Sequence, residues 1–134
     1  MVSQESIDQF LKSPAFGVVG ASTDRSKYGN KVLRCYLQNG KAAVPVNPNE
    51  QVVESIAAVP SVADLPEEVK SISIITPPKI TEKVVEQAIL KGITSIWMQP
   101  GAESSEAIKK CVAAGINVIA DGSCILVVLG YRDH

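Results

Sequence analysis

Residues 16–40 read FGVVGASTDRSKYGNKVLRCYLQNG and contain an apolar run, a loop of small and polar residues, and a helical pattern that closes on glycine. The apolar run at 16–20 carries no charge and has the length of a strand buried on both faces. The pattern at 29–39 repeats apolar residues at spacings of three and four, as an amphipathic helix does. This segment therefore predicts a strand, a loop and a helix in succession.

The same unit recurs along the rest of the chain. Further strands are predicted at 42–46, 71–76, 94–98 and 117–120, with helices that end before Gly92 and Gly115. Strands that alternate with helices of about ten residues pair in parallel, because each helix returns the chain to the same end of the sheet. With right-handed crossovers, the predicted fold is α/β and Rossmann-like: a doubly wound five-stranded parallel sheet in a three-layer α/β/α arrangement.

A single domain is expected over residues 1–134, since this length suits one hydrophobic core. Residues 1–13 are predicted to form a capping segment, with a helix at 3–12. Between 51 and 69 we expect a loop with one helical turn near 61–65. The predicted inward-facing helix residues include Leu37, Ile80, Val84, Val85, Ala88, Ile89, Ala107, Cys111 and Val112.

The composition argues against several function classes. A formal net charge of -1, with no cluster of Lys or Arg, predicts no surface for nucleic acid or an anionic membrane. No apolar stretch approaches the roughly 20 residues that span a bilayer, and the opening residues lack a signal-peptide pattern. We therefore expect a cytoplasmic protein, and a homodimer is kept as a hypothesis because small domains of this kind often form two-fold dimers.

The carboxyl ends of the predicted strands carry the candidate site, because doubly wound sheets bind ligands there. The first loop suits a phosphate, since small residues let backbone amides approach an anion at a helix N-terminus. The residues selected in this way are Gly20, Ala21, Ser22, Thr23, Lys27, Tyr28, Val46, Asn47, Pro48, Thr76, Pro77, Pro78, Gln99 and Cys124.

A dinucleotide fingerprint is absent from the first loop. The G-x-G-x-x-G pattern begun at Gly20 would need glycine where Ser22 and Arg25 stand. The acidic residue that holds an NAD ribose is also missing after Val46. An ordinary NAD dehydrogenase is therefore disfavoured. An NAD(P)-binding redox enzyme or regulator is kept as an alternative use of the same crevice, and a structural subunit with a vestigial crevice is a third hypothesis.

The sequence offers little equipment for catalysis or metal binding. Its sole histidine, His134, is the last residue, where a frayed terminus is expected rather than a general base. Cys35, Cys111 and Cys124 have no C-x-x-C spacing, so free thiols are expected and no metal site is predicted. Cys35 and Cys111 are predicted to lie in the core, and no catalytic residue is assigned.

Six motifs carry a family resemblance that covers nearly the whole chain. They are VVGAS at 18–22, KYGNKVL at 27–33, VPVNP at 44–48, PSVADLP at 60–66, TPP at 76–78 and IWMQPG at 96–101. With them the chain resembles the small CoA-binding domain proteins, which are similar to the N-terminal domain of the succinyl-CoA synthetase α subunit standing alone. The resemblance implies a protein that binds coenzyme A or an acyl-CoA. Because no catalytic constellation is visible in the sequence, binding without catalysis is expected.

The resemblance also implies how the ligand would lie. Gly20, Ala21 and Ser22 would meet the phosphates, residues 46–48 would border the nucleotide, and residues 76–78 would line the pantetheine path. Apart from the resemblance, Cys124 lies just past the strand predicted at 117–120, where a CoA thiol could reach it. A mixed disulfide with CoA is one hypothesis for this thiol, and a small buried apolar side chain is the usual alternative. Where the synthetase domain has a lysine soon after the proline of its second strand, this chain has Asn49 and Glu50.

Overall fold

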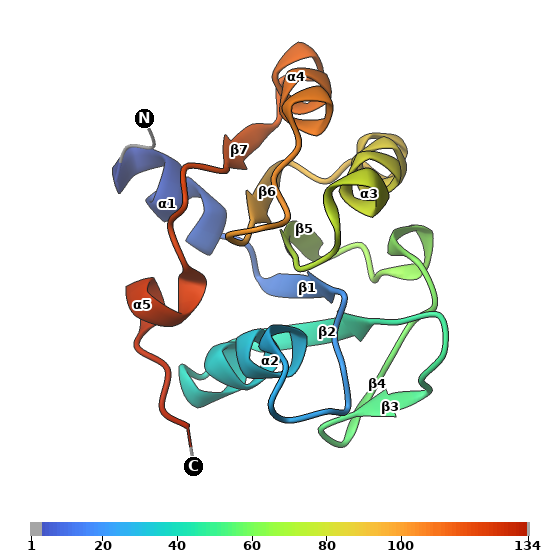
Figure 1. Cartoon of the computed structure of the whole chain (residues 1–134), viewed down its shortest axis with the longest axis vertical. Helices are drawn as coiled ribbons and strands as arrows, with labels where there is room; N and C mark the ends of the chain where they lie inside the picture. Colours follow the sequence, from blue (N-terminus) through green and yellow to red (C-terminus); the bar gives the residue numbers. More distant parts are fainter. Residues whose placement is uncertain (1–3, 134) are drawn as a thin grey trace.

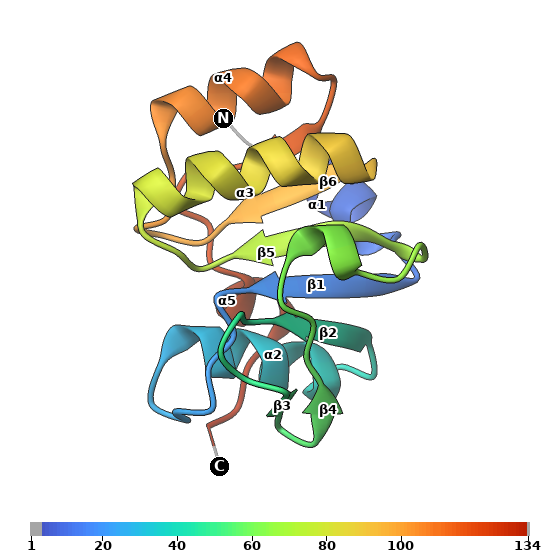
Figure 2. The same ribbon diagram turned by 90° about the vertical axis from the view of Figure 1, so that its right-hand side faces the viewer.

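The computed structural model describes residues 4–133, and five strands form its central sheet. Every neighbouring pair is parallel, and Figure 2 shows the strand arrows pointing the same way. The sheet has the order β2-β1-β5-β6-β7, so the strand order reverses at β1 and the predicted doubly wound sheet is confirmed. The strands are β1 (Ala15–Val19), β2 (Ala42–Val46), β5 (Val69–Ile74), β6 (Ser95–Met98) and β7 (Asn117–Ile119).

Helices cover both faces of this sheet, as Figures 1 and 2 show. One face carries α1 (Gln4–Leu11), α2 (Tyr28–Gln38) and α5 (Ile125–Leu129). The other carries α3 (Pro78–Lys91), α4 (Ser105–Ala113) and the short 3-10 helix η1 (Val62–Asp64). The three-layer arrangement is therefore confirmed. The start of the predicted N-terminal helix at Ser3 lies outside the described residues.

Two apolar layers hold the sheet between its helices. On the α3 and α4 face, Val85 and Cys111 pack with strand residues such as Ile72. On the α1 and α2 face the layer is aromatic: the rings of Phe10 and Trp97 meet edge to face at 5.3 Å. Each large apolar side chain buried in this way stabilises the fold by about 1.5–3 kcal/mol relative to exposure.

The segment between β2 and β5 differs in one feature from the sequence prediction. The segment after β2 contains a small hairpin, β3 (Val52–Val53) and β4 (Ile56–Ala57), whose two-residue strands are too short to show an alternating pattern. Its turn places Glu54 and Ser55 at positive φ, 50° and 67°, where glycine or asparagine is the usual signal. The helical turn predicted near 61–65 is present as η1.

The edges of the predicted helix faces were wrong. Four residues predicted to face inward are exposed: Leu37, Ile80, Ile89 and Val112. Each lies about a quarter turn or more from the centre of the buried stripe of its helix, too far round to reach the sheet. The centre of each stripe was right: Val84, Val85, Ala88, Ala107 and Cys111 are buried.

Candidate functional site

A cavity of about 840 Å³ opens at the carboxyl ends of β1, β2 and β5. This is the point where the strand order reverses, the usual ligand position in such a sheet. Its volume lies within the range of small-molecule and cofactor pockets. Its walls are the β1–α2 loop (residues 20–27), the start of α2, the end of β2, residues 60–62, the end of β5 and one side of α3.

Most of the residues predicted from the sequence line this cavity. They are Gly20, Ala21, Ser22, Lys27, Tyr28, Val46, Asn47, Pro48 and Thr76. The structure does not bring five others to its wall: Thr23, Pro77, Pro78, Gln99 and Cys124. Their contact with a ligand stays a prediction.

Gln99 and Cys124 contact each other instead. The side-chain amide of Gln99 donates to Sγ of Cys124 at 3.3 Å, and its oxygen accepts from the backbone amide of Ile125 at 2.9 Å. Gln99 is buried, so both of its polar ends are used inside the protein. In this structure it therefore anchors the start of α5.

Sequence reasoning missed part of the cavity wall. The missed lining residues are Val19, Ser26, Gly29, Pro60, Ser61, Val62, Ile75, Ile80, Val84 and Gln87. Ile80 and Val84 were assigned to the core because an apolar side chain on a helix face looks the same whether it meets a sheet or a cavity. The motif at 60–66 was a signal for the residues between β4 and η1, although it gave them no role.

Gly20 and Gly29 let the β1–α2 loop and the start of α2 approach neighbouring backbone closely. A Cβ on Gly20, which has φ +94°, would overlap the carbonyl oxygen of Ile75. A Cβ on Gly29 would overlap the carbonyl oxygen of Gly20. The start of α2 therefore packs backbone to backbone on the end of β1, an approach that only glycine permits.

Asparagine side chains hold the β1–α2 loop by its carbonyl oxygens. Asn47 donates to the carbonyl of Ala21 at 2.7 Å, and Asn30 donates to that of Ser22 at 2.8 Å. The Ser22 hydroxyl accepts from the amide of Asp24 at 3.0 Å, which closes a tight turn. Each of these bonds fixes the backbone without using the loop's first amides.

Several amides of the loop have no acceptor. Within residues 4–133, no protein group accepts a hydrogen bond from the amide of Ala21, Ser22 or Thr23. The amide of Gly20, in contrast, donates to the carbonyl of Val46 at 3.2 Å, so Gly20 serves the turn rather than a ligand. Unpaired amides at one end of a buried strand are ready donors to an anion.

The first turn of α2 adds further unpaired amides and a positive charge beside the loop. The amides of Tyr28 and Gly29 also lack an acceptor in the described part of the chain, as expected at a helix N-terminus. Lys27 precedes the helix and lines the cavity, and its ammonium takes part in none of the ion pairs found between residues 4 and 133. Amides, helix dipole and ammonium together favour a negatively charged group.

The buried thiols are chemically quiet. Burial raises the pKa of Cys35 to about 11, with a smaller contribution from the neighbouring Cys124, and burial raises that of Cys111 to about 11. Both side chains therefore stay in the protonated thiol form, which is a poor nucleophile. Both are fully buried, so the prediction that they belong to the core is confirmed. His134 lies outside the described residues.

The described part of the chain, residues 4–133, contains neither a metal-binding cluster nor a membrane-spanning helix. No three His, Cys, Asp or Glu side chains gather there as a metal site requires. The helices in the same span are too short or too polar to cross a bilayer.

Comparison with protein families and curated proteins identifies relatives. A family model described as a CoA binding domain matches residues 15–130. The chain is 30% identical over 91 residues to the α subunit of ADP-forming acetate–CoA ligase II from Pyrococcus furiosus, covering 67% of this chain and 20% of that subunit. It is 33% identical over 94 residues to ADP-forming acetate–CoA ligase II from Archaeoglobus fulgidus, covering 69% of this chain and 14% of the ligase. The chain thus spans at most a fifth of these relatives.

Solved structures share the fold over nearly their full length. A conserved hypothetical protein from Pyrococcus furiosus superposes with a TM-score of 0.81 and 38% identity, covering 85% of this chain and 97% of that one. A hypothetical protein from Pyrococcus horikoshii superposes with a TM-score of 0.88 and 30% identity, covering 95% and 89%. The predicted fold class is confirmed by these neighbours.

Proposed function

Because the chain belongs to the CoA-binding domain family, as the match over residues 15–130 establishes, we propose that it binds coenzyme A or an acyl-CoA in the cavity at the ends of β1, β2 and β5. The observation that carries this proposal is the row of unpaired amides at Ala21, Ser22 and Thr23. Together with the start of α2, these amides would bind the CoA diphosphate.

The remaining walls suit the rest of the molecule. Val46, Asn47 and Pro48 offer an edge for the nucleotide, as the family resemblance implies. Ile80 and Val84 of α3 give the opposite wall an apolar surface, which suits the slender pantetheine chain. CoA itself supplies the thiol that carries an acyl group, so the protein need only hold it.

We propose a binding role without catalysis. The residues that line the cavity include no His, Cys, Asp or Glu in the described part of the chain, so no imidazole, thiol or carboxylate of its wall is available as a base or nucleophile. The matched region is at most a fifth of each ligase relative, so the ligase reaction of those proteins is not extended to this chain.

Isothermal titration with CoA, acetyl-CoA, NAD, NADP and ATP tests the proposal. We expect heat from CoA and acetyl-CoA, and weaker or no heat from NAD and NADP. ATP shares part of the nucleotide, so it measures how much affinity the pantetheine arm adds. Absence of binding by both CoA species would reject the proposed function, and preferential binding of NAD or NADP would favour the redox alternative.

A bulky substitution locates the ligand. Ser22→Trp would fill the cavity beside the loop amides and is expected to abolish CoA binding, while circular dichroism stays that of the folded domain because Ser22 lies outside the core. Lys109→Trp, at a side chain 74% exposed on α4, is the matched control and should bind CoA normally. Unchanged affinity in Ser22→Trp would contradict this position for the ligand.

A further inference from the structure

Arg34 is a buried cation in α2, close in sequence to the β1–α2 loop but absent from the cavity wall. Only 6% of the residue is exposed, and burying a guanidinium is costly unless its donors are paired. It makes no contact with the cavity, so the proposed binding role does not yet explain it.

The guanidinium of Arg34 links the β1–α2 loop to the first turn of α2. Nη2 donates to the backbone carbonyl of Arg25 at 2.8 Å, inside the loop. Nε donates to the side-chain oxygen of Asn30 at 2.6 Å, in the first turn of the helix. One rigid, planar group therefore sets the distance between the loop and the start of α2.

Asn30 passes this constraint to the amides. Its oxygen is fixed by Arg34, so its NH2 group points the other way and donates to the carbonyl of Ser22 at 2.8 Å and to the carboxylate of Glu54 at 3.1 Å. Asn30 is fully buried, and each of its polar atoms is used. The carbonyl of Ser22 and the free amide of Thr23 belong to one peptide unit, so the bond from Asn30 also fixes that amide.

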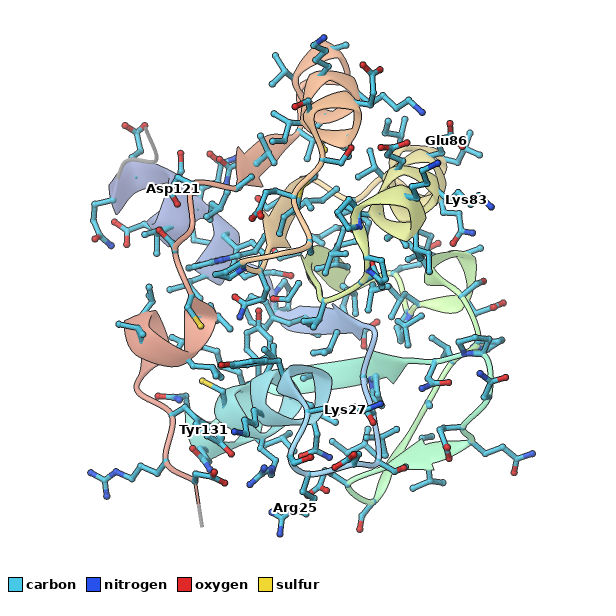
Figure 3. The ribbon with its side chains drawn as sticks, viewed as in Figure 1. Arg25, Lys27, Lys83, Glu86, Asp121 and Tyr131 are labelled. Carbon is cyan, nitrogen blue, oxygen red and sulfur yellow. The ribbon has the colours of Figure 1, made fainter. Side chains whose placement is uncertain are left out.

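The C-terminal segment closes over Arg34 from the outside. The carboxylate of Asp133 lies 3.5 Å from Nη1, and the Tyr131 ring lies 5.4 Å from the guanidinium carbon. Figure 3 shows Tyr131 and Arg25 on segments from opposite ends of the chain, both beside α2. These contacts balance the buried charge and hold the guanidinium in one orientation.

We propose that Arg34 is a positioning residue for the CoA phosphates: through Asn30 and the carbonyl of Arg25 it holds the β1–α2 loop in the shape that presents the amides of Ala21, Ser22 and Thr23 to an anion. This inference rests on the proposed function, because it concerns the same site. It assigns a role in ligand binding to a side chain that does not touch the ligand.

The geometry of the guanidinium is the essential feature, rather than its charge. A lysine would keep the positive charge, but its single ammonium cannot span the two acceptors with the fixed fork of arginine. Arg34→Lys and Arg34→Met should therefore behave alike in ligand binding. Asn117→Ala is the control for a loss of stability alone, because Asn117 donates to the carbonyl of Ser6 at the far edge of the sheet.

Two measurements test the proposal, at a temperature where circular dichroism shows each variant folded. Titration with CoA should show both Arg34 variants binding at least about tenfold more weakly than the parent protein. In the ligand-free protein, hydrogen exchange of the bonded amides of Asp24, Ser26, Lys27 and Asn30 should be faster in the Arg34 variants than in the parent, while exchange in the core strands stays unchanged. Asn117→Ala should lower thermal stability and leave both readouts unchanged.

Asn30→Asp gives a second route if an Arg34 variant does not fold. The aspartate keeps the oxygen that Arg34 needs but loses the amide donor to Ser22, so it should weaken CoA binding to a similar extent. Parent-like affinity in Arg34→Met or Asn30→Asp, or full rescue of affinity by Arg34→Lys, would overturn the proposal. If the parent protein does not bind CoA, the proposed function fails, and the exchange rates alone then decide whether Arg34 orders the loop.

Discussion

Lys27 lines the cavity beside the first turn of α2 and has no ion-pair partner within residues 4–133. If its ammonium meets a CoA phosphate, Lys27→Gln should weaken CoA binding about tenfold, since hydrogen bonds to charged groups contribute about 1.5 kcal/mol or more. The loss should shrink as salt is added, because screening already weakens the contact. Isothermal titration at two salt concentrations measures both effects.

Lys83→Gln is the control for this change in charge. Lys83 lies on α3 and, as Figure 3 shows, well away from Lys27. It does not line the cavity. The two variants have the same net charge, so equal losses of affinity would mean that only the overall field of the protein acts on the ligand.

The three thiols should react at very different rates. At pH 8, with a pKa of about 11, roughly one in a thousand of the Cys35 and Cys111 thiols is ionised. Iodoacetamide should therefore modify Cys124 first in the folded protein and reach the other two only in urea, as mass spectrometry of the peptides would show.

The same labelling tests whether Cys124 touches the ligand. Because the structure places Cys124 outside the cavity, CoA should leave its rate of alkylation unchanged. Protection by CoA, or a mixed disulfide with it, would instead support the contact predicted from the sequence.

At the level of secondary structure, the packing of α2 on β1 depends on Gly29. Helix propensity alone predicts that Gly29→Ala stabilises the domain by up to about 1 kcal/mol. The added Cβ would overlap the carbonyl oxygen of Gly20, and backbone atoms cannot move aside as a flexible side chain can. We therefore expect a net loss of about 2 kcal/mol or more in urea unfolding, together with weaker CoA binding.

Gly40→Ala is the comparison for Gly29→Ala. Gly40 has φ +70°, but a Cβ there would have no atom within 4 Å. It should cost only the strain of a left-handed residue, about 1 kcal/mol, and leave CoA affinity unchanged. Equal effects of both substitutions on CoA affinity would show that the contact between α2 and β1 does not shape the site.

The main elements were predictable because each has a strong local pattern. The strand at 15–19 is apolar throughout, and the helix at 28–38 repeats buried residues such as Val32 and Tyr36 at helical spacing. The β3–β4 hairpin was not predictable, since Glu54 and Ser55 adopt positive φ without the residues that usually mark such a turn. Its position depends on the contact of Glu54 with Asn30, which is not a local pattern.

Across the whole molecule, the C-terminal segment should respond to acid. The pKa of Asp133 is lowered below its ordinary value of 3.8, chiefly by the hydrogen bond from the Tyr131 hydroxyl and further by the charges of Lys31 and Arg34. A lowered pKa in the folded state means that these contacts stabilise the fold fully above the ordinary value and are lost as pH falls through the lowered one. The contacts of Asp133 with Lys31 and Arg34 should therefore be lost only below pH 3.8, while the hydrogen bonds between Gln38 and the backbone of Arg132 do not titrate.

An NMR titration of the Asp133 carboxyl checks this prediction. Its midpoint should lie below 3.8, and in Tyr131→Phe it should move up toward that value. A midpoint at or above 3.8 in the parent protein would contradict the contacts of Asp133 with Tyr131, Lys31 and Arg34.

The candidate site could be predicted only in part, because strand order follows from the sequence pattern but the position of a cavity does not. Topology alone places the ends of β1, β2 and β5 together, so residues such as Ser22, Asn47 and Thr76 were found from the order of the strands. Gln99 and Cys124 follow other strand ends, where the side chains bond to each other and to α5. Packing between segments that are distant in sequence decides which strand end opens into a cavity. The local sequence of one segment does not show this packing.

A crystal structure grown with excess CoA measures the position of the diphosphate directly. We predict its oxygens within hydrogen-bond distance of the amides of Ala21, Ser22 and Thr23, with Lys27 close to one of them. A complex in which those amides bind water or the protein's own side chains, while CoA lies on another face, would contradict that prediction.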